Sequence, residues 1–146
     1  MSNPMIEPTI EVADEPKELQ IRSVLLLEDD VELALSLKAL LEERDFMVTT
    51  VENGVDGLKE IMAFDFDAIV CDMMMPKMPG DMFFLAVSRA KPQLCRRFVF
   101  ITGHGDDSKV TEFMEKVNGL VLHKPVHSDD LVKMINVAAE RVEEVQ

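Results

Sequence analysis

Two kinds of hydrophobic pattern alternate along the chain. Short, mainly apolar runs predict buried strands over 21–27, 46–51, 67–71, 97–101 and 120–123. Apolar residues at spacings of three and four predict helices over 30–43, 53–64, 81–90, 107–117 and 128–143. Five strands that alternate with five helices predict an α/β fold, a doubly wound parallel sheet with helices on both faces.

Polar residues mark where two of these helices are expected to begin. Asp30 stands directly before the periodic segment 31–41, and Ser128 stands directly before Asp129 and Asp130. Side chains of both types accept a hydrogen bond from a free backbone N–H in the first helical turn. Each residue is therefore a candidate N-cap.

Acidic residues follow two of the predicted strands. The run 24–27 is followed by Glu28 and Asp29, and the run 68–71 is followed by Asp72. Ligands of open α/β sheets bind beyond the carboxyl ends of the strands, so these acids are expected to share one pocket. Carboxylates in one pocket repel one another unless a cation or a proton enters. The chemistry of this chain is therefore expected at that edge of the sheet.

Two further polar residues are expected at the same edge. Thr102 and Lys124 stand just past the fourth and fifth predicted strands. Three carboxylates suit a hard divalent cation, and Mg²⁺ leaves room for phosphate oxygens. A carboxylate can attack a phosphoryl group, toward which Lys124 offers a positive charge and Thr102 a hydroxyl donor. The pattern favours capture of a phosphoryl group.

Composition narrows the expected partners and compartment. The chain has 146 residues, enough for one domain with a core, and its net charge is −13 at pH 7. Such an acidic surface argues against direct binding of nucleic acid or an anionic membrane. No apolar run approaches the roughly 18 residues of a transmembrane helix, and no signal peptide is visible. Cys71 and Cys95 suggest no disulfide framework, so we expect a cytoplasmic protein.

The first 19 residues differ in composition from the rest of the chain. They carry Pro4, Pro8 and Pro16 among acidic residues and lack a periodic apolar pattern. This composition predicts a flexible acidic tail over 1–19, followed by one domain over 20–143.

Four short motifs together resemble the CheY-like receiver domains of two-component response regulators, over about residues 20–143. The motifs are VLLLEDD at 24–30, CDMMMPKMPG at 71–80, FITG at 100–103 and HKP at 123–125. Each lies at the end of a predicted strand, and all four occur in the family's order. The resemblance implies a flavodoxin-like sheet of five parallel strands in the order 2-1-3-4-5.

The resemblance also implies a role for each residue of the phosphoryl site. Asp72 is the expected phospho-accepting aspartate. Thr102 corresponds to the hydroxyl residue that closes on the phosphoryl group, and Lys124 to the lysine that pairs with it. The Lys124–Pro125 peptide bond is expected to be cis, as it is in that family.

The implied cofactor is Mg²⁺. Its protein ligands would be Glu28, Asp29 and Asp72, with Asp29 a direct ligand, together with the backbone carbonyl of Met74.

The implied partners are proteins. A sensor histidine kinase or a phosphotransfer protein would donate the phosphoryl group, and a downstream effector or output domain would read the changed surface. That surface is expected over 97–101, 107–117, 120–123 and 128–143, and the last three of these segments are also a candidate homodimer contact. Phosphorylation of the acceptor is self-modification, so we do not expect a turnover enzyme.

Departures from the family pattern leave alternatives open. Val121 stands where Tyr or Phe is usual, so any switch must use movement of a helix or loop. Met74 cannot orient an attacking water, although neutral His104 could, and we expect slow self-dephosphorylation. One alternative is a protein-interaction module that works without phosphorylation. Another is a hydrolase with an aspartyl intermediate, which would want an acid at position 74.

Overall fold

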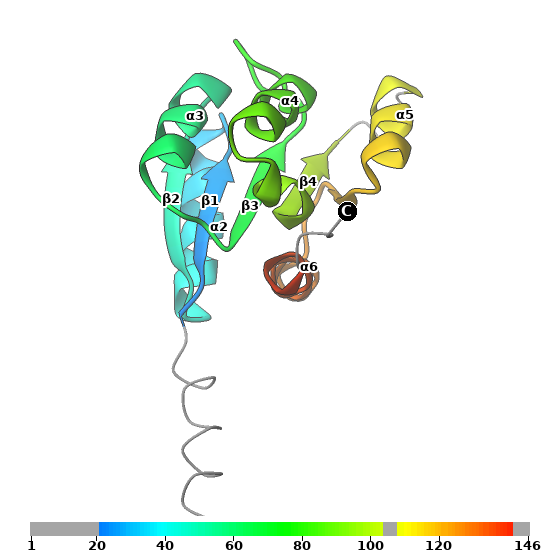
Figure 1. Ribbon diagram of the computed structural model, residues 1–146. Helices are drawn as coiled ribbons and strands as arrows, with labels where there is room; N and C mark the ends of the chain where they lie inside the picture. The colour runs from blue at the N-terminus through cyan, green and yellow to red at the C-terminus, as the bar shows by residue number, and fades with distance from the viewer. Residues whose placement is uncertain (1–20, 104–107, 142–146) are drawn as a thin grey trace, which may run out of the picture.

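A computed structural model describes residues 21–103 and 108–141. The elements in chain order are β1 (Ser23–Leu27), α2 (Val31–Glu43), β2 (Met47–Val51), α3 (Gly54–Ala63), β3 (Ala68–Asp72), α4 (Gly80–Ala90), the 3₁₀ helix η1 (Pro92–Arg97), β4 (Phe98–Thr102), α5 (Ser108–Val117), β5 (Leu120–His123) and α6 (Ser128–Glu140). The five strands form one parallel sheet in the order β2-β1-β3-β4-β5, which confirms the predicted fold (Figure 1). The predicted tail over 1–19 lies outside the described residues.

The sheet separates two hydrophobic clusters. Helices α3, α4 and α5 cover one face, and α2 and α6 cover the other (Figure 1). Alternate residues of β1 point into opposite clusters, with Leu25 and Leu27 in one and Val24 and Leu26 in the other. All four are fully buried, as expected for a central strand that has helices on both faces.

The predicted N-cap of α2 is confirmed, and the predicted N-cap of α6 is not. Asp30 is the N-cap of α2, and its Oδ1 accepts a hydrogen bond from the Leu33 N–H at 3.1 Å. The assignment of Ser128 as an N-cap was wrong. The N–H of Leu131 donates to the carbonyl of His127, so Ser128 is already helical and His127 holds the cap position without a side-chain bond.

A tight turn after β3 sets the floor of the site. The Met73 N–H donates to the Ile101 carbonyl, which extends the pairing of β3 and β4 past Asp72. The Gly80 N–H then donates back to the Met73 carbonyl at 3.1 Å. A Cβ at Gly80 would lie 2.9 Å from Met73 Cα and 3.0 Å from the Asp72 carbonyl oxygen. Only glycine therefore lets α4 start so close to the end of β3.

None of the helices within the described residues is both long and apolar enough to cross a membrane.

Candidate functional site at the carboxyl edge of the sheet

Three carboxylates meet where β1 and β3 end. Oxygen atoms of Glu28, Asp29 and Asp72 lie within 4.8 Å of one another. The register of the two neighbouring strands, Leu27 beside Cys71, places the residues that follow them side by side. Glu28 and Asp72 are both 1% exposed, whereas Asp29 is exposed to solvent. The acidic pocket expected from the sequence is therefore present, with two buried members and one at its mouth.

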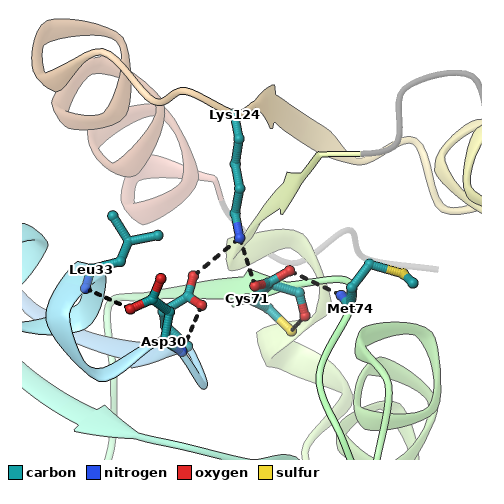
Figure 2. Close-up of polar contacts among 7 residues, drawn as sticks. Asp30, Leu33, Cys71, Met74 and Lys124 are labelled. Atoms are coloured by element: carbon teal, nitrogen blue, oxygen red, sulfur yellow. Dashed lines mark hydrogen bonds and ion pairs between the residues drawn. The ribbon is translucent and has the colours of Figure 1, made fainter.

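Lys124 reaches into this pocket from the end of β5. Its Nζ lies 3.0 Å from Asp72 Oδ2, with a hydrogen bond, and 3.6 Å from Glu28 Oε1 (Figure 2). Its backbone N–H donates to the Thr102 carbonyl at 2.9 Å, which ties the lysine to the end of β4. The Lys124–Pro125 peptide bond is cis, as expected.

Backbone amides hold the remaining carboxylate oxygens. The Met74 N–H donates to Asp72 Oδ1 at 2.9 Å, and the Asp30 N–H donates to Glu28 Oε2 at 3.0 Å (Figure 2). The buried Glu28 Oε1 has no hydrogen-bond partner among the described residues. One face of the pocket thus presents a buried anionic oxygen whose nearest counter-charge is Lys124, beyond hydrogen-bond distance.

The pocket shifts the acid–base properties of its members. Burial, aided by the neighbouring Asp72 charge and opposed by the Asp30 amide bond and Lys124, raises the pKa of Glu28 from 4.5 to about 7. Burial alone would lower the pKa of Lys124. The hydrogen bond to Asp72 and the charges of Asp72 and Glu28 outweigh it and raise that pKa. The pocket therefore favours the positively charged form of Lys124 and disfavours the negatively charged form of Glu28.

The donor set fits a hard divalent cation. All the ligand atoms that the cluster offers are carboxylate oxygens, which Mg²⁺ and Ca²⁺ prefer. Glu28 Oε1 is buried without a hydrogen bond, and an incoming cation would compensate it. The neighbouring thiol of Cys71 does not compete as a ligand. It is fully buried in the core, and burial raises its pKa well above the usual range.

Three of the remaining predicted residues lie around the pocket. Thr102 is the last residue of β4, fully buried and next to the strand that carries Asp72. Met74 is 50% exposed on the turn after β3, so its thioether faces solvent while its amide faces Asp72. Val121 pairs in register with Phe100 of β4. His104 lies outside the described residues.

Sequence reasoning missed the two backbone donors. The amides of Asp30 and Met74 each bond a carboxylate two residues earlier in the chain. Asp side chains frequently accept a hydrogen bond from the backbone two residues later, and this tendency could have predicted the bond between Met74 and Asp72.

Comparison with known proteins gives one consistent family. The family model for the response regulator receiver domain matches residues 24–136. The chain is 29% identical over 126 residues to the cell cycle response regulator CtrA of Brucella ovis, covering 81% of this chain and 50% of CtrA. It is 27% identical over 118 residues to the transcriptional regulatory protein GlrR of Escherichia coli, covering 81% of this chain and 26% of GlrR.

A solved structure agrees with the sequence matches. The response regulator receiver domain protein from Clostridium thermocellum superimposes with a TM-score of 0.72 at 27% identity, covering 81% of this chain and 94% of that one. The curated relatives are longer, and the chain spans half of CtrA and about a quarter of GlrR.

Proposed function

The chain belongs to the response regulator receiver domain family, and from that premise we propose that it accepts a phosphoryl group on Asp72 and thereby changes its protein contacts. The donor is a phosphohistidine on a sensor histidine kinase or a phosphotransfer protein. The observation that carries the proposal is the arrangement of Asp72 itself. It is a buried carboxylate with one oxygen held by a backbone amide and the other by Lys124.

The chemistry is a displacement at phosphorus. A carboxylate oxygen of Asp72 attacks the phosphorus atom, the P–N bond to the donor imidazole breaks, and the electron pair leaves with the imidazole. Lys124, 3.0 Å from Asp72 Oδ2, is in place to pair with an oxygen of the transferred group. The Met74 amide keeps the other carboxylate oxygen fixed during the attack. Thr102, at the end of the neighbouring strand, supplies the hydroxyl that closes on the product.

We infer that Mg²⁺ is the resident cation. Glu28, Asp29 and Asp72 would bind it together with the backbone carbonyl of Met74, and Asp29 would be a direct ligand. When bound, the cation would neutralise the negative charge that the phosphoryl group adds to an already anionic pocket. Support comes from the all-oxygen donor set and from the buried Glu28 Oε1, which accepts no hydrogen bond among the described residues.

The phosphorylated state is proposed to be long-lived. The exposed thioether of Met74 offers no hydrogen bond that would orient water toward the acyl phosphate. The chain then acts as a modified switch rather than a turnover enzyme, and its readout is a partner protein or an output domain. The surface of α5, β5 and α6 is the proposed contact, for a partner or for a second copy of the chain.

A second function is favoured by one observation. Val121 occupies β5 at a position where the family usually has an aromatic ring, and a valine cannot swing such a ring toward Thr102. A domain that binds partners without phosphorylation would need no such movement. The two functions differ in whether Asp72 is modified.

Intact mass spectrometry after incubation with acetyl phosphate tests the proposal. We expect a gain of one phosphoryl group with Mg²⁺, no gain with a chelator, and no gain for Asp72→Asn. Asp45→Asn is the matched control, because Asp45 is exposed and has a φ of 71°, which asparagine tolerates well. A folded wild-type chain that gains no mass would reject phosphoryl transfer and favour the phosphorylation-independent module.

A further inference from the structure

Helix α5 is attached to the sheet by few buried side chains. Of the α5 residues that the structure describes, Val110 alone is buried. Helix α6 buries three residues, Leu131, Ile135 and Ala138. The other apolar residues of α5 that pack on the core, among them Phe113 and Met114, are only partly buried. The position of α5 therefore depends on a small number of contacts.

Clefts lie on both sides of α5, and both border the Asp72 site. One, of about 200 Å³, has Thr102, Met114 and Val121 in its lining. The other, of about 250 Å³, has Met74 and Met82 in its lining. Val110 lines both. Close-packed interiors resist displacement of a helix, so this unfilled space gives α5 room to shift.

The ring of Phe113 joins α5 to the strand that carries Thr102. It lies edge-on to Phe100 of β4, with ring centroids 5.5 Å apart and planes at 85°, and edge-on to Phe84 of α4, at 5.5 Å and 84°. Phe100 is also stacked on Phe98 of the same strand at 5.2 Å. Edge-to-face ring pairs have a preferred geometry, so a small movement of one ring favours a matching movement of the other.

Phe100 and Thr102 lie on the same side of β4. Residues two apart in a strand point to the same face, and Phe113 covers the ring of Phe100 while Met114 lines the cleft beside Thr102. A displacement of the end of β4 can therefore be transmitted to α5 through the contact between the rings of Phe100 and Phe113. The cleft beside Thr102 leaves space into which the helix can move.

We propose that Phe113 is the positioning residue that couples the Asp72 site to α5. This inference rests on the proposed phosphorylation of Asp72. When Thr102 closes on the phosphoryl group, the end of β4 moves, the ring pair of Phe100 and Phe113 re-forms its edge-on contact, and α5 shifts within the two clefts. Val121, too small to fill the cleft beside Thr102, leaves the space that this movement uses.

Methionine methyl groups report on this movement. In protein labelled with ¹³C at the methionine methyls, Met114 reports on the cleft beside Thr102 and Met82 on the cleft beside Met74. Met134 of α6 packs against the opposite cluster and serves as the internal reference. On addition of acetyl phosphate and Mg²⁺, we expect the NMR signals of Met114 and Met82 to shift and the signal of Met134 to stay.

Variants separate the role of the ring from general packing. In Phe113→Leu we expect phosphoryl uptake, measured by intact mass, to match wild type while the Met114 and Met82 shifts are lost. Phe46→Leu removes a buried ring from the opposite cluster and is the matched control, for which uptake and both shifts should persist.

The outcomes distinguish the inference from its premise. No phosphoryl uptake by wild type would reject the proposed function and this inference with it. Uptake without any shift at Met114 would reject the inference and leave the function standing. Wild-type shifts in Phe113→Leu, or loss of uptake in that variant, would overturn the coupling role. If Phe113→Leu fails to fold, Phe113→Ile takes its place, and a Met114 shift in that variant that matches wild type would overturn the coupling role.

Discussion

Helices α6 and α5 cover opposite faces of the same edge of the sheet, yet they are held very differently. α6 lays Leu131, Ile135 and Ala138 against the core, each fully buried. α5 buries Val110 alone among its described residues and is bordered by two clefts. Lys124 precedes α6, and Thr102 precedes α5 in the chain. The positive charge of the site, Lys124, is thus connected to the tightly packed helix α6. Thr102, which is proposed to move, is connected to the loosely packed helix α5.

This difference in packing suits two different functions, a rigid support for Lys124 and a movable surface on α5. A lysine that holds a carboxylate at 3.0 Å benefits from a rigid support, because the position of the lysine helps to fix the position of Asp72. A helix that must change its exposed surface benefits from shallow packing, because little core contact is broken when it shifts. Substitutions in α6 and in α5 therefore test the packing of the two helices separately.

The largest effect is expected from truncating the core of α6. Ile135→Ala removes a fully buried side chain and should lower the free energy of unfolding by about 2–5 kcal/mol. Val110→Ala removes fewer carbons from a residue that is 8% exposed, and about 1–2 kcal/mol is expected from the lost methyl groups. Urea denaturation followed by circular dichroism measures both, since the chain has no Trp or Tyr. Equal losses would show that α5 is as firmly packed as α6.

The pocket between the two sides should make stability depend on pH. Glu28 has a pKa of about 7 when folded and an ordinary value of 4.5. Between these values the folded state binds more protons than the unfolded state, so stability falls as the pH rises. The total loss attributable to Glu28 is roughly 3 kcal/mol between pH 4.5 and 7, and it levels off above pH 7.

The variant Glu28→Gln isolates that titration from the other acids. Without divalent cations, the difference in unfolding free energy between wild type and Glu28→Gln should change in favour of the variant as the pH rises from 4.5 to 7. A constant difference across that range would mean that Glu28 ionises in the folded state as it does in the unfolded one. Mg²⁺ should recover part of the wild-type loss above pH 7, because a cation compensates the ionised pocket.

A smaller effect is expected at the turn that follows Asp72. Gly80→Ala would bring a Cβ to 2.9 Å from the backbone of Met73, and overpacking of this kind costs about 1–3 kcal/mol. Because the strained atoms belong to the turn after Asp72, phosphoryl uptake should slow as well. Gly103→Ala is the matched control, since its Cβ would meet only Lys124 Cδ at 3.8 Å. Equal effects of the two variants on stability would contradict the close approach at Gly80.

Local residue patterns predicted the strands and the acidic pocket, whereas the strand order followed from the resemblance to receiver domains. The strands read as mainly apolar runs, and Glu28, Asp29 and Asp72 stand directly at strand ends. Most helix and strand bounds were within one or two residues of the structure, and the 3₁₀ helix Pro92–Arg97 was not expected.

The features that the sequence did not reveal arise from contacts between distant residues. The ring contacts of Phe113 join segments that are separated along the chain, and the clefts beside α5 are spaces that no local pattern encodes. The cap of α6 was missed because Ser128 is a common cap residue, while the backbone bond from Leu131 to His127 decided the start of the helix. The roles of Asp72, Thr102 and Lys124 stay predictions until phosphoryl uptake is measured.

The smallest expected effect concerns the polar contacts of α6. Arg22 donates to Asn136 Oδ1 at 2.8 Å and to Glu140 Oε2 at 3.1 Å, joining the start of β1 to the last turns of α6. Glu140 is 66% exposed, so the ion pair adds little, and Arg22→Ala should cost about 0.5–1 kcal/mol, mostly through the Asn136 bond.

Arg44→Ala is the matched comparison for that loss. Arg44 pairs with Asp129, whose side chain is 88% exposed, and its removal should change stability by less than about 0.5 kcal/mol. If α6 is held chiefly by its apolar face, both arginine variants must fall well below Ile135→Ala in the same urea experiment. A loss for Arg22→Ala that equals the loss for Ile135→Ala would mean that polar ties, rather than buried side chains, make α6 the fixed side of the domain.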